Sequence, residues 1–105
     1  MQLNLCPLFS GSSGNSVYVA CGGVKLLVDA GVSATRVEAN LREIGVDIRE
    51  IDAILVTHEH VDHVRGLGVL CRRFGLPVYA NEGTWQGIAQ KESGIPPKCV
   101  RTFYT

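Results

Sequence analysis

All three histidines of this chain lie in one short segment, Thr57-His58-Glu59-His60-Val61-Asp62-His63. Imidazole nitrogens and carboxylate oxygens are ligands that zinc, manganese and iron accept in proteins, so this set of side chains indicates a divalent-metal site. His58 and His60 are two residues apart, and such side chains point the same way in an extended segment, so both can bind one cation. Asp62 and His63 follow where the chain turns towards a helix, and they can bind a second cation close by.

Single residues of this segment also have ordinary interpretations. Asp62 alone would be typical of a helix N-cap, and a lone histidine is usually a surface or core residue. Glu59 is expected to point away from the first cation, into solvent or against the loop. The whole string His-x-His-x-Asp-His, placed between an apolar strand and a helix, is much more specific than any of its parts. We therefore predict metal ligands at His58, His60, Asp62 and His63.

The elements around this segment predict a single mixed α/β domain over residues 1–105. The unbroken apolar run 53–56, just before the histidines, is typical of a central strand buried on both faces. Further strands are expected at 3–9, 17–20, 24–28, 77–80 and 99–103. Helical spacing of apolar residues predicts helices that start near Ala34, Val64 and Trp85.

The ends of two predicted helices carry recognisable signals. Either Ser33 or Thr35 can cap the first helix, and Thr35 with Glu38 fits a capping box, while Gly45 can end it. The second helix is expected to run from Val64 through Leu67 and Cys71 to Phe74, with Gly75 beyond it. Arg65, Arg72 and Arg73 would lie on this second helix, where they either contact a nucleic-acid backbone or remain solvated partners of the helix dipole. Trp85 is expected to pack in its helix rather than stack on a base.

Two other places can support a metal site. Asp29 ends an apolar strand, and we predict that it accepts hydrogen bonds from the metal segment, in which Thr57 is the first residue; a simple turn or cap is the alternative. The loop 10–16 is rich in serine and glycine, and its backbone N–H groups can form a nest for a phosphate. An ordinary hairpin loop is the alternative there. The candidate residues of this phosphate loop are Ser12, Ser13, Gly14 and Asn15.

Composition sets limits on the class of protein. The chain is 46% hydrophobic and 19% charged, and ten basic residues balance ten acidic ones, so net charge favours neither a nucleic-acid nor a membrane partner. The four cysteines form no Cys-x-x-Cys pair, which favours free thiols in a reducing compartment. The start of the chain carries no signal-peptide pattern, and no apolar run approaches the roughly 20 residues of a membrane span. A cytoplasmic protein is expected.

The segment 57–63 resembles the signature of the metallo-β-lactamase-fold hydrolases. Four further stretches, together with the strand that precedes the histidines, resemble the YycJ/WalJ branch of that superfamily, which is bacterial and grouped with nucleases and RNA-processing enzymes. These stretches are 10–16, 27–31, 54–60, 66–68 and 77–81.

The resemblance implies an αββα sandwich that holds two divalent metal ions, zinc or manganese, between its sheets. His58 and His60 would bind the first metal, and Asp62 and His63 the second, with Asp62 also steering the water that attacks the substrate. The family completes the site with a later histidine, a bridging aspartate and a last histidine, which this sequence does not contain. We therefore expect the N-terminal half of such a domain, inactive by itself, with an exposed sheet face or edge through which it can form a homo-oligomer.

Three functions follow from this resemblance. The first is a metal-dependent phosphodiesterase, exonuclease-like, that acts on nucleic acid. The second is a non-catalytic fragment that binds metal weakly or serves as an interaction partner. The third is a hydrolase of small molecules, such as a lactonase or a thioesterase, because one fold hosts many chemistries.

Overall fold

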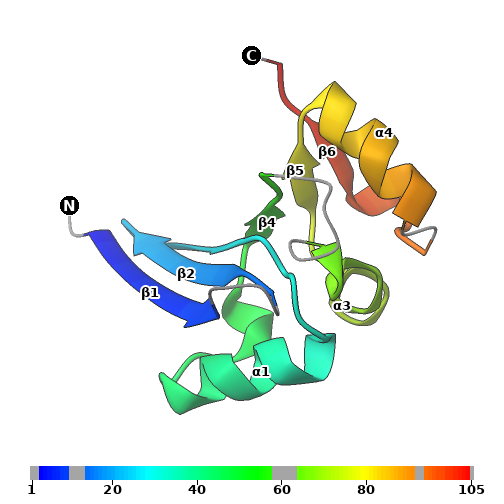
Figure 1. Ribbon diagram of the computed structural model, residues 1–105. Helices are drawn as coiled ribbons and strands as arrows, with labels where there is room; N and C mark the ends of the chain where they lie inside the picture. The colour runs from blue at the N-terminus through cyan, green and yellow to red at the C-terminus, as the bar shows by residue number, and fades with distance from the viewer. Residues whose placement is uncertain (1–2, 10–13, 58–63, 92–93, 105) are drawn as a thin grey trace.

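The computed structural model describes residues 3–9, 14–57, 64–91 and 94–104. These residues form one six-stranded sheet with the strands in chain order and three α-helices packed against it (Figure 1). The strands are β1 (Leu3–Phe9), β2 (Ser16–Cys21), β3 (Val24–Val28), β4 (Ala53–Leu55), β5 (Val78–Ala80) and β6 (Val100–Thr102). The helices are α1 (Ala34–Glu43), α3 (Leu67–Phe74) and α4 (Glu82–Lys91), with short 3₁₀ turns η1 (Ile48–Glu50) and η2 (Pro97–Cys99).

The sheet is mixed. β1, β2 and β3 are antiparallel neighbours joined by short connections, whereas β3, β4, β5 and β6 run parallel to one another. Parallel neighbours need a crossover connection, and α1, α3 and α4 lie in the three crossovers. The carboxyl ends of β3 to β6 therefore meet at one edge of the sheet, and the segment with the histidines leaves β4 at that edge. The predicted mixed α/β class is confirmed.

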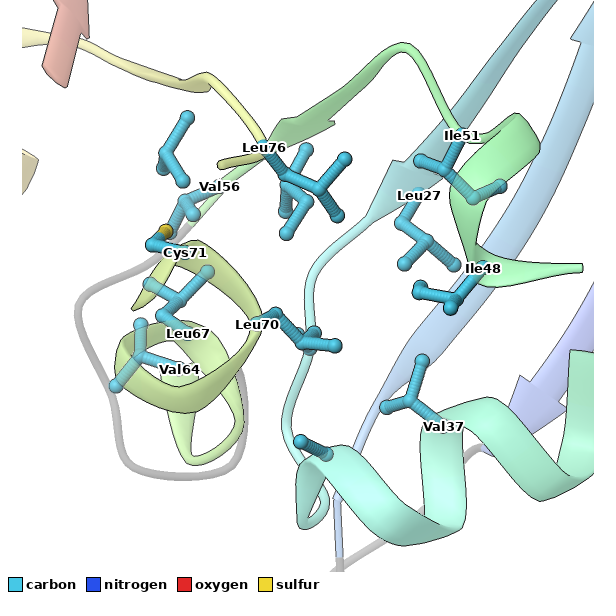
Figure 2. Close-up of a cluster of buried hydrophobic side chains, with 14 of the residues drawn as sticks. Leu27, Val37, Ile48, Ile51, Val56, Val64, Leu67, Leu70, Cys71 and Leu76 are labelled. Carbon is cyan, nitrogen blue, oxygen red and sulfur yellow. The ribbon is translucent and has the colours of Figure 1, made fainter. Parts of the chain in front are cut away.

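One face of the sheet carries the core. Tyr18, Leu27, Ile54 and Val78 are register partners across β2 to β5, and all are buried. They form one cluster with apolar side chains from all three helices. Figure 2 shows Leu27 and, on α1, Val37 directed into the same space between that helix and the sheet. Burying each such side chain contributes about 1.5–3 kcal/mol, so this cluster fixes the helices on the sheet.

The opposite face of the sheet is also apolar but open to solvent. Leu5, Val19 and Leu26 are register partners across β1, β2 and β3 on this face. Leu5 is 62% exposed and Leu3 is 61% exposed, while Val19 and Leu26 are half-buried. We call this set of side chains the open face.

The first helix begins where one of the two expected caps lies. Ser33 has an extended backbone, and its Oγ accepts a hydrogen bond from the Arg36 N–H at 3.4 Å, so Ser33 is the N-cap. Thr35 therefore lies inside the helix, and the capping box predicted for Thr35 and Glu38 is wrong. Gly45 follows the helix with a φ of +80°, as expected of the residue that ends it.

The predicted second helix is interrupted: Val64 is helical, residues 65–66 form a turn, and α3 begins at Leu67. The cause is Gly66, which packs against the backbone that follows β3. Its N–H donates to the Ala30 carbonyl oxygen at 2.7 Å, and a Cβ at position 66 would lie 2.5 Å from the Val32 carbonyl oxygen. Arg65 consequently lies in a turn before the helix.

The other boundaries differ little from expectation. Gly75 ends α3 in a left-handed conformation, with φ +65°. The last strand is shorter than predicted, because residues 97–99 form η2 before β6 begins at Val100. No helix of the described ranges is long and apolar enough to cross a bilayer.

Candidate metal centre

The carboxylate of Asp29 binds the residue from which the histidine segment starts. Val28 and Leu55 are register partners in the parallel pair β3–β4, so Asp29 and Thr57 leave the sheet at the same edge. The Thr57 N–H donates to Asp29 Oδ1 at 2.8 Å, and the Thr57 hydroxyl donates to Asp29 Oδ2 at 2.7 Å. Asp29 is only 6% exposed. Because hydrogen bonds to a buried carboxylate are among the stronger ones in proteins, this pair fixes Thr57 firmly.

The backbone of Asp29 is strained. Its φ of +65° lies in the left-handed region, which costs a non-glycine residue roughly 1–2 kcal/mol, although aspartate tolerates it better than most. Neighbouring strands hold the residue there on both sides: the Asp29 N–H donates to the Leu55 carbonyl oxygen at 2.7 Å, and the Asp29 carbonyl oxygen accepts from Ser16 Oγ at 2.8 Å. Strain of this kind concentrates at functional sites.

The described end of the serine-glycine loop packs against the residues after Asp29. The Gly31 N–H donates to the Asn15 carbonyl oxygen at 2.8 Å. Gly14 has a φ of +148°, and a Cβ there would lie 2.6 Å from Val32 Cγ1 and 2.8 Å from the Gly31 carbonyl oxygen, so only glycine fits. The segment 30–32 thus contacts both Gly14 and Gly66 closely.

The structure therefore brings four of the predicted site residues to one edge of the sheet: Gly14, Asn15, Asp29 and Thr57. The predicted ligands His58, His60, Asp62 and His63 lie outside the described residues, as do Ser12 and Ser13 of the predicted phosphate loop. Within the described ranges, no group of three or more His, Cys, Asp or Glu side chains can hold a metal ion. Three imidazoles and a carboxylate that begin one residue beyond the Asp29–Thr57 pair fit a divalent cation in their chemistry.

Sequence reasoning did not single out Ser16 or Gly66. In the sequence, Ser16 is only the last residue of the serine-glycine loop. In the structure, it is the first residue of β2, and its side chain is fully buried. Gly66 fell inside a predicted helix, where a glycine is unfavourable relative to alanine and therefore signals a close backbone contact.

The accessory side chains that could have contacted a nucleic acid make internal bonds. Arg72 Nη1 donates to the Gly94 carbonyl oxygen at 2.8 Å, and Arg73 Nη1 lies 3.2 Å from Glu38 Oε2. Trp85 Nε1 donates to the Arg101 carbonyl oxygen at 2.8 Å, and the ring packs against the core, as predicted. Arg72 and Arg73 are exposed in spite of these bonds, so a contact with nucleic acid and a solvated position at the helix end both stay predictions.

A sequence profile of the Metallo-beta-lactamase superfamily matches residues 10–98. The chain belongs to this superfamily. Among curated relatives, it is 49% identical over 96 residues to the exodeoxyribonuclease YycJ of Bacillus anthracis, which covers 91% of this chain and 36% of that protein. It is 53% identical over 81 residues to the exodeoxyribonuclease WalJ of Streptococcus pneumoniae serotype 2 (strain D39 / NCTC 7466), covering 77% and 30% of the two chains.

The fold agrees with solved structures of the superfamily. The Rm3 metallo-beta-lactamase superposes with a TM-score of 0.72 at 28% identity, over 95% of this chain and 45% of that one. The predicted superfamily and the resemblance to the YycJ/WalJ branch are confirmed. The chain spans about a third of the length of the two exodeoxyribonucleases that it matches.

Proposed function

We propose that this chain is part of a metal-dependent hydrolase that cleaves phosphodiester bonds in nucleic acid, as an exonuclease-like enzyme. The observation that carries the proposal is the buried Asp29 carboxylate, which accepts both hydrogen bonds from Thr57 at the start of the histidine segment. Two relatives that are about 50% identical in sequence are both named exodeoxyribonucleases, and these names support nucleic acid as the substrate class. A small-molecule hydrolase on the same fold is less favoured, because these relatives are more similar in sequence than the lactamases are.

In this proposal, His58 and His60 hold one cation, and Asp62 and His63 hold the other. When bound, two divalent cations, zinc or manganese, supply charge that activates a water and stabilises the phosphoryl group under attack. Asp62 also orients the attacking water. Asp29 and Thr57 do not bind metal; they fix the backbone from which the ligands project, as partners behind metal ligands commonly do.

We propose that the loop with Ser12, Ser13, Gly14 and Asn15 binds a phosphate of the substrate. The close packing of Gly14 on Val32 and the bond from Gly31 to Asn15 support this role, because they hold the described end of the loop, residues 14–15, close to the chain after Asp29. Backbone N–H groups in such loops bind anions. The proposal includes a bacterial, cytoplasmic enzyme, which the four free cysteines and the bacterial relatives support.

A second candidate concerns the 105 residues alone, namely an inactive fragment that binds metal weakly or associates with a partner. The chain's coverage of about a third of its relatives and the open face favour it. Four ligands divided between two cations leave each cation with only two protein donors, which predicts weak binding. We propose that turnover requires a longer chain, of the length of the relatives.

Metal analysis tests the ligand assignment. The double variant His58→Ala, His60→Ala is expected to lose most of the zinc or manganese that the parent retains, whereas Glu59→Gln, in the same segment, is expected to retain it. Equal metal content in the parent and the double variant would remove the assignment.

Nuclease assays test the activity. With manganese or zinc, a chain as long as the relatives is expected to degrade DNA, and Asp62→Ala is expected to abolish that degradation. The 105-residue chain is expected to show none. Robust cleavage by the short chain, lost in Asp62→Ala, would contradict the view that it is incomplete.

A further inference from the structure

The buried hydroxyl of Ser16 lies at the point where the β2–β3 pairing ends. Val17 and Val28 form the last backbone pair of this antiparallel ladder, so Ser16 and Asp29 are the next residues on the two strands. Ser16 is fully buried, and its Oγ donates to the Asp29 carbonyl oxygen at 2.8 Å. A side-chain hydrogen bond thus continues the contact between the two strands beyond the last ladder pair.

The left-handed conformation of Asp29 explains why a side chain is used here. In an extended strand the N–H and C=O of one residue point to the same side, and the Asp29 N–H points to β4, where it donates to the Leu55 carbonyl oxygen at 2.7 Å. With φ at +65°, the Asp29 carbonyl group departs from that direction. The carbonyl oxygen lies instead within reach of the Ser16 hydroxyl on β2, which donates to it at 2.8 Å. Asp29 is therefore held from β2 at its C=O and from β4 at its N–H.

This backbone conformation aims the Asp29 carboxylate at Thr57. The carboxylate accepts the Thr57 N–H and hydroxyl at 2.8 and 2.7 Å. The chain of contacts runs from Ser16 through Asp29 to Thr57, and each bond in it is shorter than 3 Å. We infer that Ser16 is a positioning residue that acts through Asp29 to fix Thr57, the residue from which the predicted metal segment begins.

The inference rests on the proposed function only in its consequence for metal affinity, so its first test uses the metal-free chain in the presence of a chelator. Thr57 is exposed, so protection of its amide proton from exchange depends on the bond to Asp29. Ser16→Ala is expected to speed hydrogen–deuterium exchange of the Thr57 amide by about three- to tenfold, the effect of losing one hydrogen bond.

The molecule offers a matched internal control. The amide of Arg49, also on an exposed residue, donates to Asp47 Oδ1 at the same distance of 2.8 Å, far from Ser16 in the sequence. Its exchange is expected to stay unchanged in Ser16→Ala. Ser33→Ala, which removes the hydroxyl that caps α1, is expected to leave Thr57 unchanged. Ser16→Cys keeps a side chain of similar shape with a weaker donor; it should give an intermediate rate and provides a folded variant if Ser16→Ala fails to fold.

The outcomes are separable. Unchanged exchange of the Thr57 amide in both Ser16 variants would overturn the inference, because it would show that Ser16 does not affect Thr57. Equal acceleration of exchange at Thr57 and Arg49 would also overturn it, because it would show only a global loss of stability. In a second experiment, isothermal titration with zinc alone, Ser16→Ala is expected to bind several-fold more weakly than the parent. Faster Thr57 exchange with unchanged zinc affinity would reduce Ser16 to a structural residue and overturn the positioning role. Zinc binding too weak to measure in the 105-residue parent is what two protein donors per cation predict, and the exchange result alone would then decide the inference.

Discussion

At the scale of single residues, Asp29 joins three segments through one side chain and one peptide unit. It accepts from Ser16 on β2, donates to Leu55 on β4 and accepts twice from Thr57. The sequence predicted that Asp29 would accept hydrogen bonds from the histidine segment, and the bonds to Thr57 are of this kind. The sequence could not predict the left-handed backbone, because aspartate adopts that conformation only occasionally, whereas glycine adopts it readily.

Replacement of Asp29 by asparagine tests the importance of the charge. Asn tolerates the left-handed backbone equally well, but it is neutral, so the Thr57 N–H loses a charged acceptor and the Thr57 hydroxyl must accept from the amide nitrogen instead of donating. We expect Asp29→Asn to lower the free energy of unfolding by about 1–3 kcal/mol, because a buried charged acceptor is lost. Chemical denaturation measures this loss.

The control for this substitution is Asp52→Asn. Asp52 is exposed, and one of its oxygens accepts the Lys25 N–H at 2.8 Å, so it makes a similar bond without burial. Its loss is expected to stay below about 1 kcal/mol. Equal effects of the two substitutions would contradict a special importance of the Asp29–Thr57 pair.

At the scale of elements, Gly66 decides where α3 begins. Gly66→Ala would place a Cβ 2.5 Å from the Val32 carbonyl oxygen, which is backbone and cannot move aside cheaply. We expect a loss of stability of about 1–3 kcal/mol, as in other overpacked sites. Gly83→Ala, in α4, meets its nearest atom at 3.8 Å and is expected to be neutral or to stabilise by up to about 1 kcal/mol. Similar unfolding curves for the two variants would show that the contact at Gly66 relaxes freely.

The turn η1, before β4, carries a cluster of charged side chains that the sequence analysis did not predict. Asp47 and Glu50 form a capping box on η1, in which Glu50 Oε2 accepts the Asp47 N–H at 2.7 Å. Glu50 also pairs with Lys25 Nζ at 2.7 Å, and Asp47 pairs with Arg49 at 3.2 Å. The hydrogen bond from Lys25 holds the pKa of Glu50 below its ordinary 4.5, and that from the Arg49 side chain holds the pKa of Asp47 below its ordinary 3.8.

These shifts predict how stability depends on pH. Because both pKa values are lowered on folding, the two carboxylates stabilise the protein above their ordinary pKa values, and this contribution disappears as the pH falls through the lowered ones. The double variant Asp47→Asn, Glu50→Gln keeps groups that can accept hydrogen bonds but removes the charges. We expect it to be less stable than the parent at pH 7, with a difference that shrinks steadily once the pH falls below about 4.5.

Urea denaturation at a series of pH values from 7 to 3 measures this difference. Glu43→Gln, on the last turn of α1, controls for the removal of a negative charge from the surface. A difference between parent and double variant that stays constant over the series would contradict the role of the charges.

At the scale of the whole molecule, much of the fold could be predicted because local and global signals agree. The apolar run at β4 marked the centre of the sheet, and the alternation of strands and helices after it marked the parallel half. The start of α3 could not be predicted, because a contact between Gly66 and the chain after β3 overrides helical periodicity. The positions of the metal ligands relative to one another could not be derived either, since spacing in sequence gives donor types and order but no distances.

The open face gives the last prediction. Leu5, Val19 and Leu26 form a row across three strands that no helix covers in the described structure, and exposed apolar patches of this kind favour association. We propose that the 105-residue chain self-associates through this face, and we expect sedimentation velocity to show dimers or larger species that increase with concentration. Leu5→Lys places a charge on the face while it leaves the backbone edge of β1 intact, so it is expected to shift the chain to monomer.

Val69→Lys is the matched control for that charge. Val69 lies on α3 and is 38% exposed, so the substitution adds the same side chain at another exposed apolar position. It is expected to leave the association unchanged. If Leu5→Lys associates as strongly as the parent, the contact runs through the edge of β1 rather than through the open face. An edge contact uses backbone N–H and C=O groups, which this substitution leaves in place. A parent that stays monomeric at high concentration would contradict both routes, and would mean that half-buried neighbours such as Val19 and Leu26 shield the exposed leucines well enough to keep the sheet soluble.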